Sequence, residues 1–213
     1  MTTGGPVRVA VADYGAGNLV SIRNALTLLG ADVSVATDAD GLAGAALIVV
    51  PGVGASGPAM ARLRRRGLAG AIPAAVADGA WYLGICLGMQ LLFERSEEVG
   101  ARMLGLLGGD VRRLVDAPRL PHIGWNGLER VGDPPLLAGL PDGAPAYFVH
   151  SYAPVPADPD VIAARTTHGR PFVSCVATGR LVGCQFHPER SGADGLRILR
   201  NVLTLAAGEV PAC

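Results

Sequence analysis

One cysteine stands where a predicted strand runs into a predicted helix. The stretch Tyr82–Gln90 reads YLGICLGMQ and has Cys86 at the junction, with a glycine two residues away on each side. This is the cysteine version of the nucleophile elbow, a sharp turn whose strained backbone exposes the reactive atom. The glycines let neighbouring segments approach closely, and the N-terminus of the helix favours the thiolate. A small buried cysteine at a tight turn is the alternative interpretation.

A histidine and a glutamate follow another apolar run late in the chain. Residues Gln185–Glu189 read QFHPE. His187, at the end of a predicted strand, suits a general base, and Glu189 can reach around the intervening proline to orient the ring. Together with Cys86 they predict a Cys-His-Glu triad for nucleophilic catalysis. Taken alone, the same residues would indicate an ordinary surface turn.

The remaining cysteines raise the possibility of a metal site. Cys175, Cys184 and His187 are three candidate ligands, but no CxxC pair accompanies them. We therefore expect no metal and no cofactor. Four cysteines are also too few and too scattered for a disulfide framework, which predicts a cytoplasmic protein. We expect Cys175, Cys184 and Cys213 either to pack in the core or to be exposed in the tail of the chain.

A glycine-rich turn follows a third apolar run. Residues Pro51–Gly54 read PGVG. A backbone N–H of Gly52 or Val53 can complete an oxyanion hole whose first donor is the N–H of Leu87. Glycines on both sides of Val53 leave this peptide free to reorient, so the hole need not be preformed. A plain strand-to-helix turn is the alternative.

Two polar side chains, Gln90 and Glu94, follow the nucleophile one helical turn apart. On a helix they would project from the same face. Polar groups in this place can bind the amino-acid head of a substrate, which makes both residues candidate substrate ligands. A solvated helix face is the alternative.

Apolar runs and helical periodicity alternate in the first half of the chain. Strands are predicted at residues 7–12, 32–36, 46–50 and 81–85. Helices are predicted at residues 19–29, from 59 onward and at 87–95. Strands that alternate with helices predict an α/β fold, in which a mostly parallel sheet is covered by helices on both faces.

The pattern changes beyond Gly105, where proline-rich loops separate short extended pieces. These are predicted near residues 147–150, 161–166, 172–177 and 181–186. An antiparallel extension of the sheet fits this half, and Leu196, Leu199 and Leu203 indicate a closing helix. Because no linker or composition shift marks a boundary, we expect a single domain over residues 1–213.

Charge and composition argue against several classes of function. Formal net charge is zero, and all 18 basic residues are arginine. The absence of lysine removes Schiff-base chemistry, and the neutral balance gives no support for nucleic acid or an anionic membrane as partner. Residues 41–61 carry no charge, but prolines and glycines interrupt them, which favours a buried strand and loop over a membrane span. Residues 1–6 lack the features of a signal peptide.

Taken together, the motifs resemble those of a known family, the class-I, triad-type glutamine amidotransferases. The resemblance rests on GICLGMQ at 84–90, PGVG at 51–54 and HPE at 187–189. Four further motifs are similar to those of one branch, the glutaminase subunits of imidazole glycerol phosphate synthase in histidine biosynthesis. They are DYGAGN at 13–18, PHIGWN at 121–126, YFVHSY at 147–152 and QFHPERSG at 185–192.

The resemblance implies a flavodoxin-like fold and an enzyme that hydrolyses L-glutamine to glutamate and ammonia through a cysteine thioester. It assigns Cys86 as nucleophile, His187 as base and Glu189 as orienting acid. Glutamine would lie against the oxyanion turn and Leu87. The other expected substrate contacts are Gln90, Glu94 and the backbone of Ser151 and Tyr152.

A partner protein is also implied by the resemblance. It is a cyclase subunit with a (β/α)8-barrel fold, which forms a heterodimer with the glutaminase and receives its ammonia. The residues expected to lie toward it are Asn18, His122, Trp125 and Asn126. For His122, Trp125 and His150, packing in a turn-rich sheet is the alternative.

The chain departs from the family pattern at two positions, where Arg119 and Arg190 stand in place of lysine. Both keep the positive charge, although the two side chains differ in geometry. Three other functions fit parts of the sequence. They are a glutaminase for another synthase, a free-standing cysteine hydrolase and a catalytically silent binding subunit.

Overall fold

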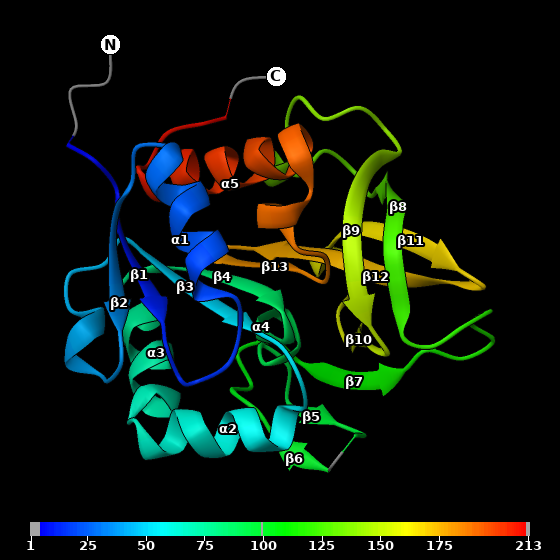
Figure 1. Ribbon diagram of the computed structural model, residues 1–213, viewed down its shortest axis with the longest axis horizontal. Coiled ribbons are helices and arrows are strands. Elements are labelled where there is room, and N and C mark those ends of the chain that lie inside the picture. The colour runs from blue at the N-terminus through cyan, green and yellow to red at the C-terminus, as the bar shows by residue number, and fades with distance from the viewer. Residues whose placement is uncertain (1–4, 99, 212–213) are drawn as a thin grey trace.

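The computed structural model describes residues 5–98 and 100–211, which form a large sheet flanked by helices (Figure 1). The parallel strands of this sheet are β1 (Arg8–Ala12), β2 (Asp32–Ala36), β3 (Leu47–Gly52), β4 (Trp81–Cys86) and β13 (Leu181–Cys184). The strands that continue it are β8 (His122–Arg130), β9 (Ala144–His150), β11 (Ile162–His168) and β12 (Arg170–Thr178).

Within the described residues the sheet has nine strands, in the order β2-β1-β3-β4-β13-β12-β11-β8-β9. Neighbours from β2 to β13 are parallel, whereas every pair from β13 to β9 is antiparallel. The predicted α/β fold is therefore confirmed, with a parallel half and an antiparallel extension from the C-terminal part of the chain. The change from one half to the other occurs at β13, which adjoins the strand that carries Cys86.

Helices cover both faces of the parallel half (Figure 1). One face carries α1 (Leu19–Leu28) and α5 (Gly192–Ala206), and the other carries α2 (Ser56–Arg65) and α3 (Leu68–Ala77). Side chains of successive strand residues point to opposite faces. Accordingly, Val9 and Val11 pack with the α1 and α5 side, while Ala10 packs with the α2 and α3 side.

Local signals explain where the first helix begins and ends. Asn18 caps α1, because its Oδ1 accepts the Ser21 N–H at 3.3 Å and its Nδ2 donates to Ser21 Oγ at 2.7 Å. At the other end Gly30 has φ of 86°, a left-handed conformation that stops the helix as predicted. The Asn18 side chain therefore has a structural role at the exposed start of this helix.

The helix predicted at 87–95 is wrong beyond Gln90, because α4 spans only Leu87–Gln90. Leu91, Leu92 and Phe93 are fully buried in turns. Their carbonyls accept N–H groups from residues 104, 107 and 105, so they do not bond forward along a helix. Tertiary packing overrides the apolar helical pattern here.

A second sheet was not predicted. It contains β5 (Arg95–Ser96), β6 (Ala101–Arg102), β7 (Gly109–Arg113) and β10 (Tyr152–Pro156), in the order β10-β7-β5-β6. Two of these strands have two residues each, too short to show a periodic pattern. The 3₁₀ turns are η1 (Asp40–Leu42), η2 (Pro135–Leu137), η3 (Pro159–Val161) and η4 (Pro188–Arg190).

The uncharged stretch at 41–61 forms β3 and the start of α2, with the intervening turn. All six residues of β3 are buried, as expected for a central parallel strand. No described helix combines the length and apolar character that crossing a membrane would require.

Candidate active site

Cys86 lies at a strained turn between β4 and α4, which confirms the predicted strand–turn–helix geometry. Its φ of 53° and ψ of −109° are unusual for a residue with a side chain. The flanking glycines are sterically required: a Cβ on Gly84 would meet the Gly88 carbonyl, and a Cβ on Gly88 would meet the Val50 carbonyl. Tyr82 Oη donates to the Gly88 carbonyl at 2.7 Å, which fixes the turn further.

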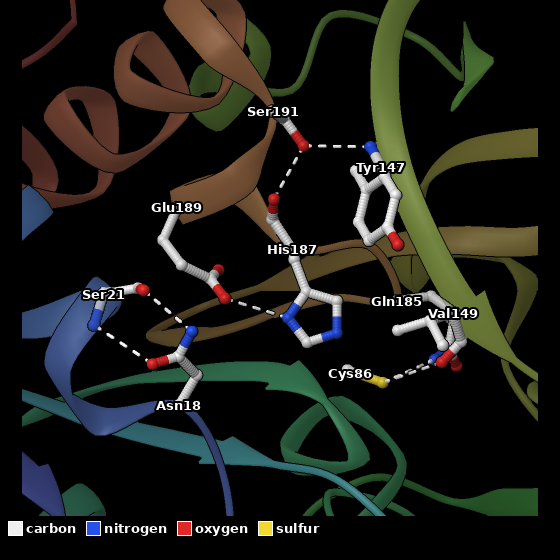
Figure 2. Close-up of polar contacts among 9 residues, drawn as sticks. All are labelled: Asn18, Ser21, Cys86, Tyr147, Val149, Gln185, His187, Glu189 and Ser191. Carbon is white, nitrogen blue, oxygen red and sulfur yellow. Dashed lines mark hydrogen bonds and ion pairs between the residues drawn. The ribbon is translucent and has the colours of Figure 1, made fainter. Parts of the chain in front are cut away.

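His187 and Glu189 contact each other, and both lie above Cys86 in the view of Figure 2. The imidazole Nδ1–H donates to Glu189 Oε1 at 2.9 Å, and both side chains are almost excluded from solvent. This bond makes Nε2 the nitrogen that accepts or delivers a proton. Nε2 is buried without a hydrogen-bond partner in the described part of the chain, and its edge of the ring is turned toward Cys86.

Three hydrogen bonds link the backbone around His187 to β9, and Figure 2 shows the two that involve Ser191. His187 N–H donates to the Tyr147 carbonyl at 2.9 Å, and Tyr147 N–H donates to Ser191 Oγ at 3.0 Å. Ser191 Oγ in turn donates to the His187 carbonyl at 2.7 Å. The base is therefore held by the antiparallel half of the sheet and the nucleophile by the parallel half.

Electrostatics favour a charged imidazole at this position. Burial lowers the pKa of His187, but the adjacent Cys86 and Glu189 side chains outweigh burial and raise the pKa to about 10. His187 therefore carries a proton at neutral pH. An imidazolium beside the sulfur stabilises a thiolate, the form of cysteine that attacks carbonyl carbon.

The predicted oxyanion turn lies directly beside the nucleophile. Gly52 pairs with Cys86 in the register of β3 and β4. A Cβ on Gly52 would meet the Tyr14 hydroxyl and the Leu87 side chain, so only glycine fits there. Val53, the next residue, is 48% exposed and borders the cleft described below.

A cleft of about 330 Å³ opens over Cys86. Its walls bring together several predicted site residues from distant segments. The lining residues are Val53, Gly54, Ala55, Cys86, Leu87, Gln90, Glu98, Pro121, Val149, His150, Ser151 and Tyr152. A cleft of this size suits a small molecule such as an amino acid.

One predicted substrate residue lies in the cleft and the other does not. Gln90, the last residue of α4, lines the cleft, and its Nε2 donates to the Tyr152 carbonyl at 3.0 Å. Glu94 was expected one helical turn later, but α4 has already ended, and Glu94 Oε2 accepts the Gly109 N–H at 3.1 Å. The prediction for Glu94 is therefore wrong.

Glu98 takes the place expected for Glu94. It lines the cleft, and its Oε2 accepts from the Ser56 N–H at 3.1 Å and from Ser56 Oγ at 3.4 Å. Sequence reasoning missed it because Glu98 follows the unpredicted strand β5. It also missed Gln185, whose side chain contacts the sulfur, although QFHPE had been singled out as a motif.

A family model shows which protein family the chain belongs to. The model described as Glutamine amidotransferase class-I matches residues 10–205, which include the elbow, the oxyanion turn and the His187–Glu189 pair. The chain belongs to the class-I glutamine amidotransferases. The prediction of an enzyme of this class is thereby confirmed.

Curated relatives narrow the family for this amidotransferase. A protein of Xylella fastidiosa strain Temecula1 is 51% identical over 201 residues, covering 93% of this chain and 98% of that one. A protein of Symbiobacterium thermophilum is 50% identical over 195 residues, with 91% and 92% covered. A protein of Dehalococcoides mccartyi strain CBDB1 is 43% identical over 202 residues, with 94% and 98% covered. All three are named imidazole glycerol phosphate synthase subunit HisH, and this amidotransferase belongs with them.

Two solved structures share the fold. A crystal structure of a glutamine amidotransferase has a TM-score of 0.74 at 24% identity, covering 93% of this chain and 98% of that one. The structure of PurLQS from Thermotoga maritima has a TM-score of 0.76 at 22% identity, with 95% and 99% covered. At these identities the likeness concerns the fold, and it confirms the flavodoxin-like architecture.

An exposed aromatic and basic group marks one face of the amidotransferase. Trp125 on β8 is 57% exposed and lies edge-on to Tyr147 of β9, with ring centroids 6.0 Å apart. The Arg190 guanidinium stacks over the Tyr147 ring at 4.3 Å. Ile123, two residues before the tryptophan, is 61% exposed. These four residues are called the β8–β9 face below.

Two other predicted partner residues are engaged within the chain. His122 is buried and stacks on Phe148 at 4.9 Å and on His168 at 4.0 Å. Its Nδ1 lies 3.2 Å from His150 Nε2. Burial lowers the pKa of His122 to about 4, which keeps the ring neutral. Asn126 Nδ2 donates to the Thr167 carbonyl at 2.8 Å.

The other described cysteines lie in the core. Cys175 and Cys184 face each other across β12 and β13 as free thiols, with Sγ atoms 3.8 Å apart and no exposed surface. Among residues 5–98 and 100–211, no group of three or more His, Cys, Asp or Glu side chains is arranged to hold a metal ion. Cys213 lies outside the described residues.

Proposed function

We propose that this amidotransferase hydrolyses L-glutamine at Cys86 and delivers the ammonia to the cyclase subunit of imidazole glycerol phosphate synthase, in histidine biosynthesis. One observation carries the proposal. The sulfur lies at a strained turn at the base of a cleft, with a His187–Glu189 pair turned toward it from another part of the sheet. The HisH names of the relatives support the choice of partner.

The first half of the reaction forms a thioester. The Cys86 thiolate attacks the side-chain amide carbon of glutamine, and the carbonyl oxygen becomes an oxyanion. The imidazolium of His187 gives its proton to the amide nitrogen, the carbon–nitrogen bond breaks, and ammonia leaves. Glu189 stabilises the imidazolium and holds the ring in place through the 2.9 Å hydrogen bond.

The second half hydrolyses the thioester. Neutral His187 takes a proton from water, and the resulting hydroxide attacks the thioester carbon. Glutamate leaves as the carbon–sulfur bond breaks, which restores the thiolate and the imidazolium. We propose that the Leu87 N–H and an N–H of Gly52 or Val53 hold both oxyanions, and loss of one such donor typically costs ~10²–10³ in rate.

The cleft provides groups for each end of the substrate. Gln90 and the Glu98 carboxylate offer acceptors for the α-ammonium group of glutamine, and the backbone of Ser151 and Tyr152 lines the opposite wall. The reacting amide would then point toward Cys86. This choice replaces Glu94 by Glu98 in the predicted set.

For the partner, we propose a (β/α)8-barrel cyclase that docks on the β8–β9 face and forms a heterodimer. Apolar and aromatic surface next to a basic side chain is typical of protein interfaces. Asn18 lies at the exposed start of α1. His122 and Asn126 lie on β8 next to Ile123 and Trp125, which belong to the face. We also propose that the chain acts as one domain in the cytoplasm, where thiols stay reduced.

Because free ammonia would be lost to solvent, glutaminase activity should stay low until the partner has bound its own ligand. Gly54, which follows Val53, has φ of 88°, and glycines on both sides of Val53 leave its peptide free to reorient. This freedom supports an oxyanion hole that forms fully only when the partner activates the enzyme. Full turnover by the isolated chain would contradict this part of the proposal.

The test separates the two reactions of the complex. In Cys86→Ala, glutamine-dependent synthesis by the reconstituted synthase should be lost, while synthesis from added ammonium salts should continue. Cys175→Ala, which removes a buried thiol away from the cleft, is the matched control and should retain both activities. If Cys86→Ala lost synthesis from glutamine and from ammonium salts equally, the proposal that this chain supplies the ammonia and the partner uses it would be refuted.

A further inference from the structure

The side chain of Gln185 contacts the nucleophile directly. It follows β13, has no exposed surface, and its Nε2 donates to Cys86 Sγ at 3.7 Å (Figure 2). The catalytic scheme above does not use this residue. A carboxamide is costly to bury unless its polar atoms are paired, so its position against the sulfur calls for an explanation.

Strand geometry explains why Gln185 and His187 both reach the sulfur. Parallel pairing places Cys184 beside Ile85 in β13 and β4, so the residues that follow each strand end at the same edge. Along an extended chain, alternate side chains point the same way. Gln185 is held extended by its N–H, which donates to the Ser174 carbonyl at 2.9 Å.

The hydrogen bonds around the carboxamide fix which of its ends faces the sulfur. Gln90 Nε2 donates both to the Tyr152 carbonyl at 3.0 Å and to Gln185 Oε1 at 3.1 Å. A backbone carbonyl can only accept, so the NH₂ group of Gln90 must point this way. Gln185 must then present its oxygen to Gln90 and its own NH₂ group to Cys86.

The sulfur therefore makes two different contacts, as donor to the Val149 carbonyl and as acceptor from Gln185. As a thiol, Cys86 donates to the Val149 carbonyl at 3.7 Å, a contact that a thiolate would lose. The N–H of Gln185 gains strength when the sulfur is negative, because hydrogen bonds to ions are stronger than those between neutral groups. The balance between the two contacts bears on the protonation of the nucleophile.

We propose that Gln185 is a positioning residue that donates a hydrogen bond to the Cys86 thiolate and links the sulfur to the substrate-binding side chain of Gln90. This inference rests on the proposed function of Cys86 as nucleophile. It assigns Gln185 two effects: the carboxamide NH₂ favours the thiolate, and the carboxamide oxygen holds Gln90 with its own oxygen free for the substrate.

Two variants separate these effects. Gln185→Met keeps the length of the side chain but removes both hydrogen bonds. Gln185→Glu keeps an oxygen that accepts from Gln90, while its charge faces the sulfur in place of a donor. Both should move the acid limb of Cys86 alkylation by iodoacetamide upward by about one pH unit, as expected for loss of a hydrogen bond to an ion. Only Gln185→Met should also raise the KM for glutamine, by about tenfold.

Alkylation is followed across pH in the chain bound to its partner, and peptide mapping assigns the label to Cys86. Thermal unfolding shows which variants are folded. Ser174→Ala is the matched control, because it trims a buried hydroxyl on the strand next to Gln185 and leaves the carboxamide bonds in place. It should alkylate like the parent chain. Should Gln185→Met fail to fold, the isosteric Gln185→Glu carries the alkylation test.

An unchanged alkylation profile in the folded variants would overturn the proposal, as would an equal shift in Ser174→Ala. A shift confined to the two Gln185 variants would support it. Failure of the proposed function looks different, because the parent complex itself would then show no glutaminase activity and no protection of Cys86 by glutamine.

Discussion

The hydroxyl of Tyr14 donates a buried 2.8 Å hydrogen bond to the carbonyl of Pro51, the residue that opens the oxyanion turn. In a trans peptide the carbonyl and the following N–H point in opposite directions. Tyr14 therefore also sets the direction of the Gly52 N–H. The peptide after it, between Gly52 and Val53, is not held by this hydrogen bond.

Removal of this hydroxyl should destabilise the chain. In Tyr14→Phe the Pro51 carbonyl stays buried but loses its partner, and we expect the free energy of unfolding to fall by about 1–3 kcal/mol. Urea unfolding of the two proteins measures the difference. Equal stability would mean that the carbonyl finds another donor once the hydroxyl is gone.

The raised pKa of His187 predicts a loss of stability in alkali. The folded chain holds this proton more tightly than the unfolded chain, since the pKa rises from 6.5 to about 10 on folding. Its contribution is complete below pH 6.5 and disappears as the pH rises through about 10. Glu189→Gln removes one cause of the rise, so the decline should be smaller and should end at a lower pH.

Urea unfolding between pH 6.5 and 10.5 measures that decline. Glu209→Gln, at an exposed position near the C-terminus, is the charge-matched control and should follow the parent curve. If the Glu189→Gln and parent curves have the same shape, the carboxylate does not hold the proton on His187.

A methyl group at the elbow should be poorly tolerated. In Gly88→Ala the new Cβ would meet the Val50 carbonyl, so backbone must move and overpacking should cost about 1–3 kcal/mol or more. Gly70→Ala is the matched control. Gly70 lies in α3 with open space around its Cα, so alanine there should stabilise by about 0.5–1 kcal/mol. Thermal unfolding of the two variants should therefore move in opposite directions.

Truncation of the β8–β9 face should weaken partner binding without affecting the fold. Trp125→Ala removes a large exposed aromatic side chain of the kind that dominates interface energetics, and affinity for the cyclase should fall about tenfold or more. Leu28→Ala, an exposed apolar residue on α1, should bind like the parent chain. Titration calorimetry measures both. Unchanged affinity in Trp125→Ala would move the interface elsewhere.

Sequence reasoning succeeded where pattern and chemistry agree. The central strands are uniformly apolar and the elbow has its glycines, so β3, β4 and the position of Cys86 followed from local signals alone. The His187–Glu189 pair was predicted because its members are two residues apart. Periodicity failed beyond Gln90, where buried turns imitate an apolar helix, and this error carried Glu94 into the predicted site.

Contacts between distant segments were beyond the reach of the sequence. Glu98 borders the cleft because β5 pairs with β7, and such short strands leave no pattern. Tyr14 and Gln185 belong to motifs that were recognised, yet their partners, the Pro51 carbonyl and the Cys86 sulfur, are set by strand order. A motif identifies which residues matter, while register decides what they touch.

The pairing of β4 with β13 makes the triad sensitive to any slip between these two strands. Because strand side chains alternate, a one-residue deletion within β13 would turn the imidazole to the opposite side of the sheet. By contrast, extra residues in the loops that join the two strands would leave their alignment intact. The sequence separation of about a hundred positions between Cys86 and His187 can therefore change, whereas the alignment of the four residue pairs between β4 and β13 cannot.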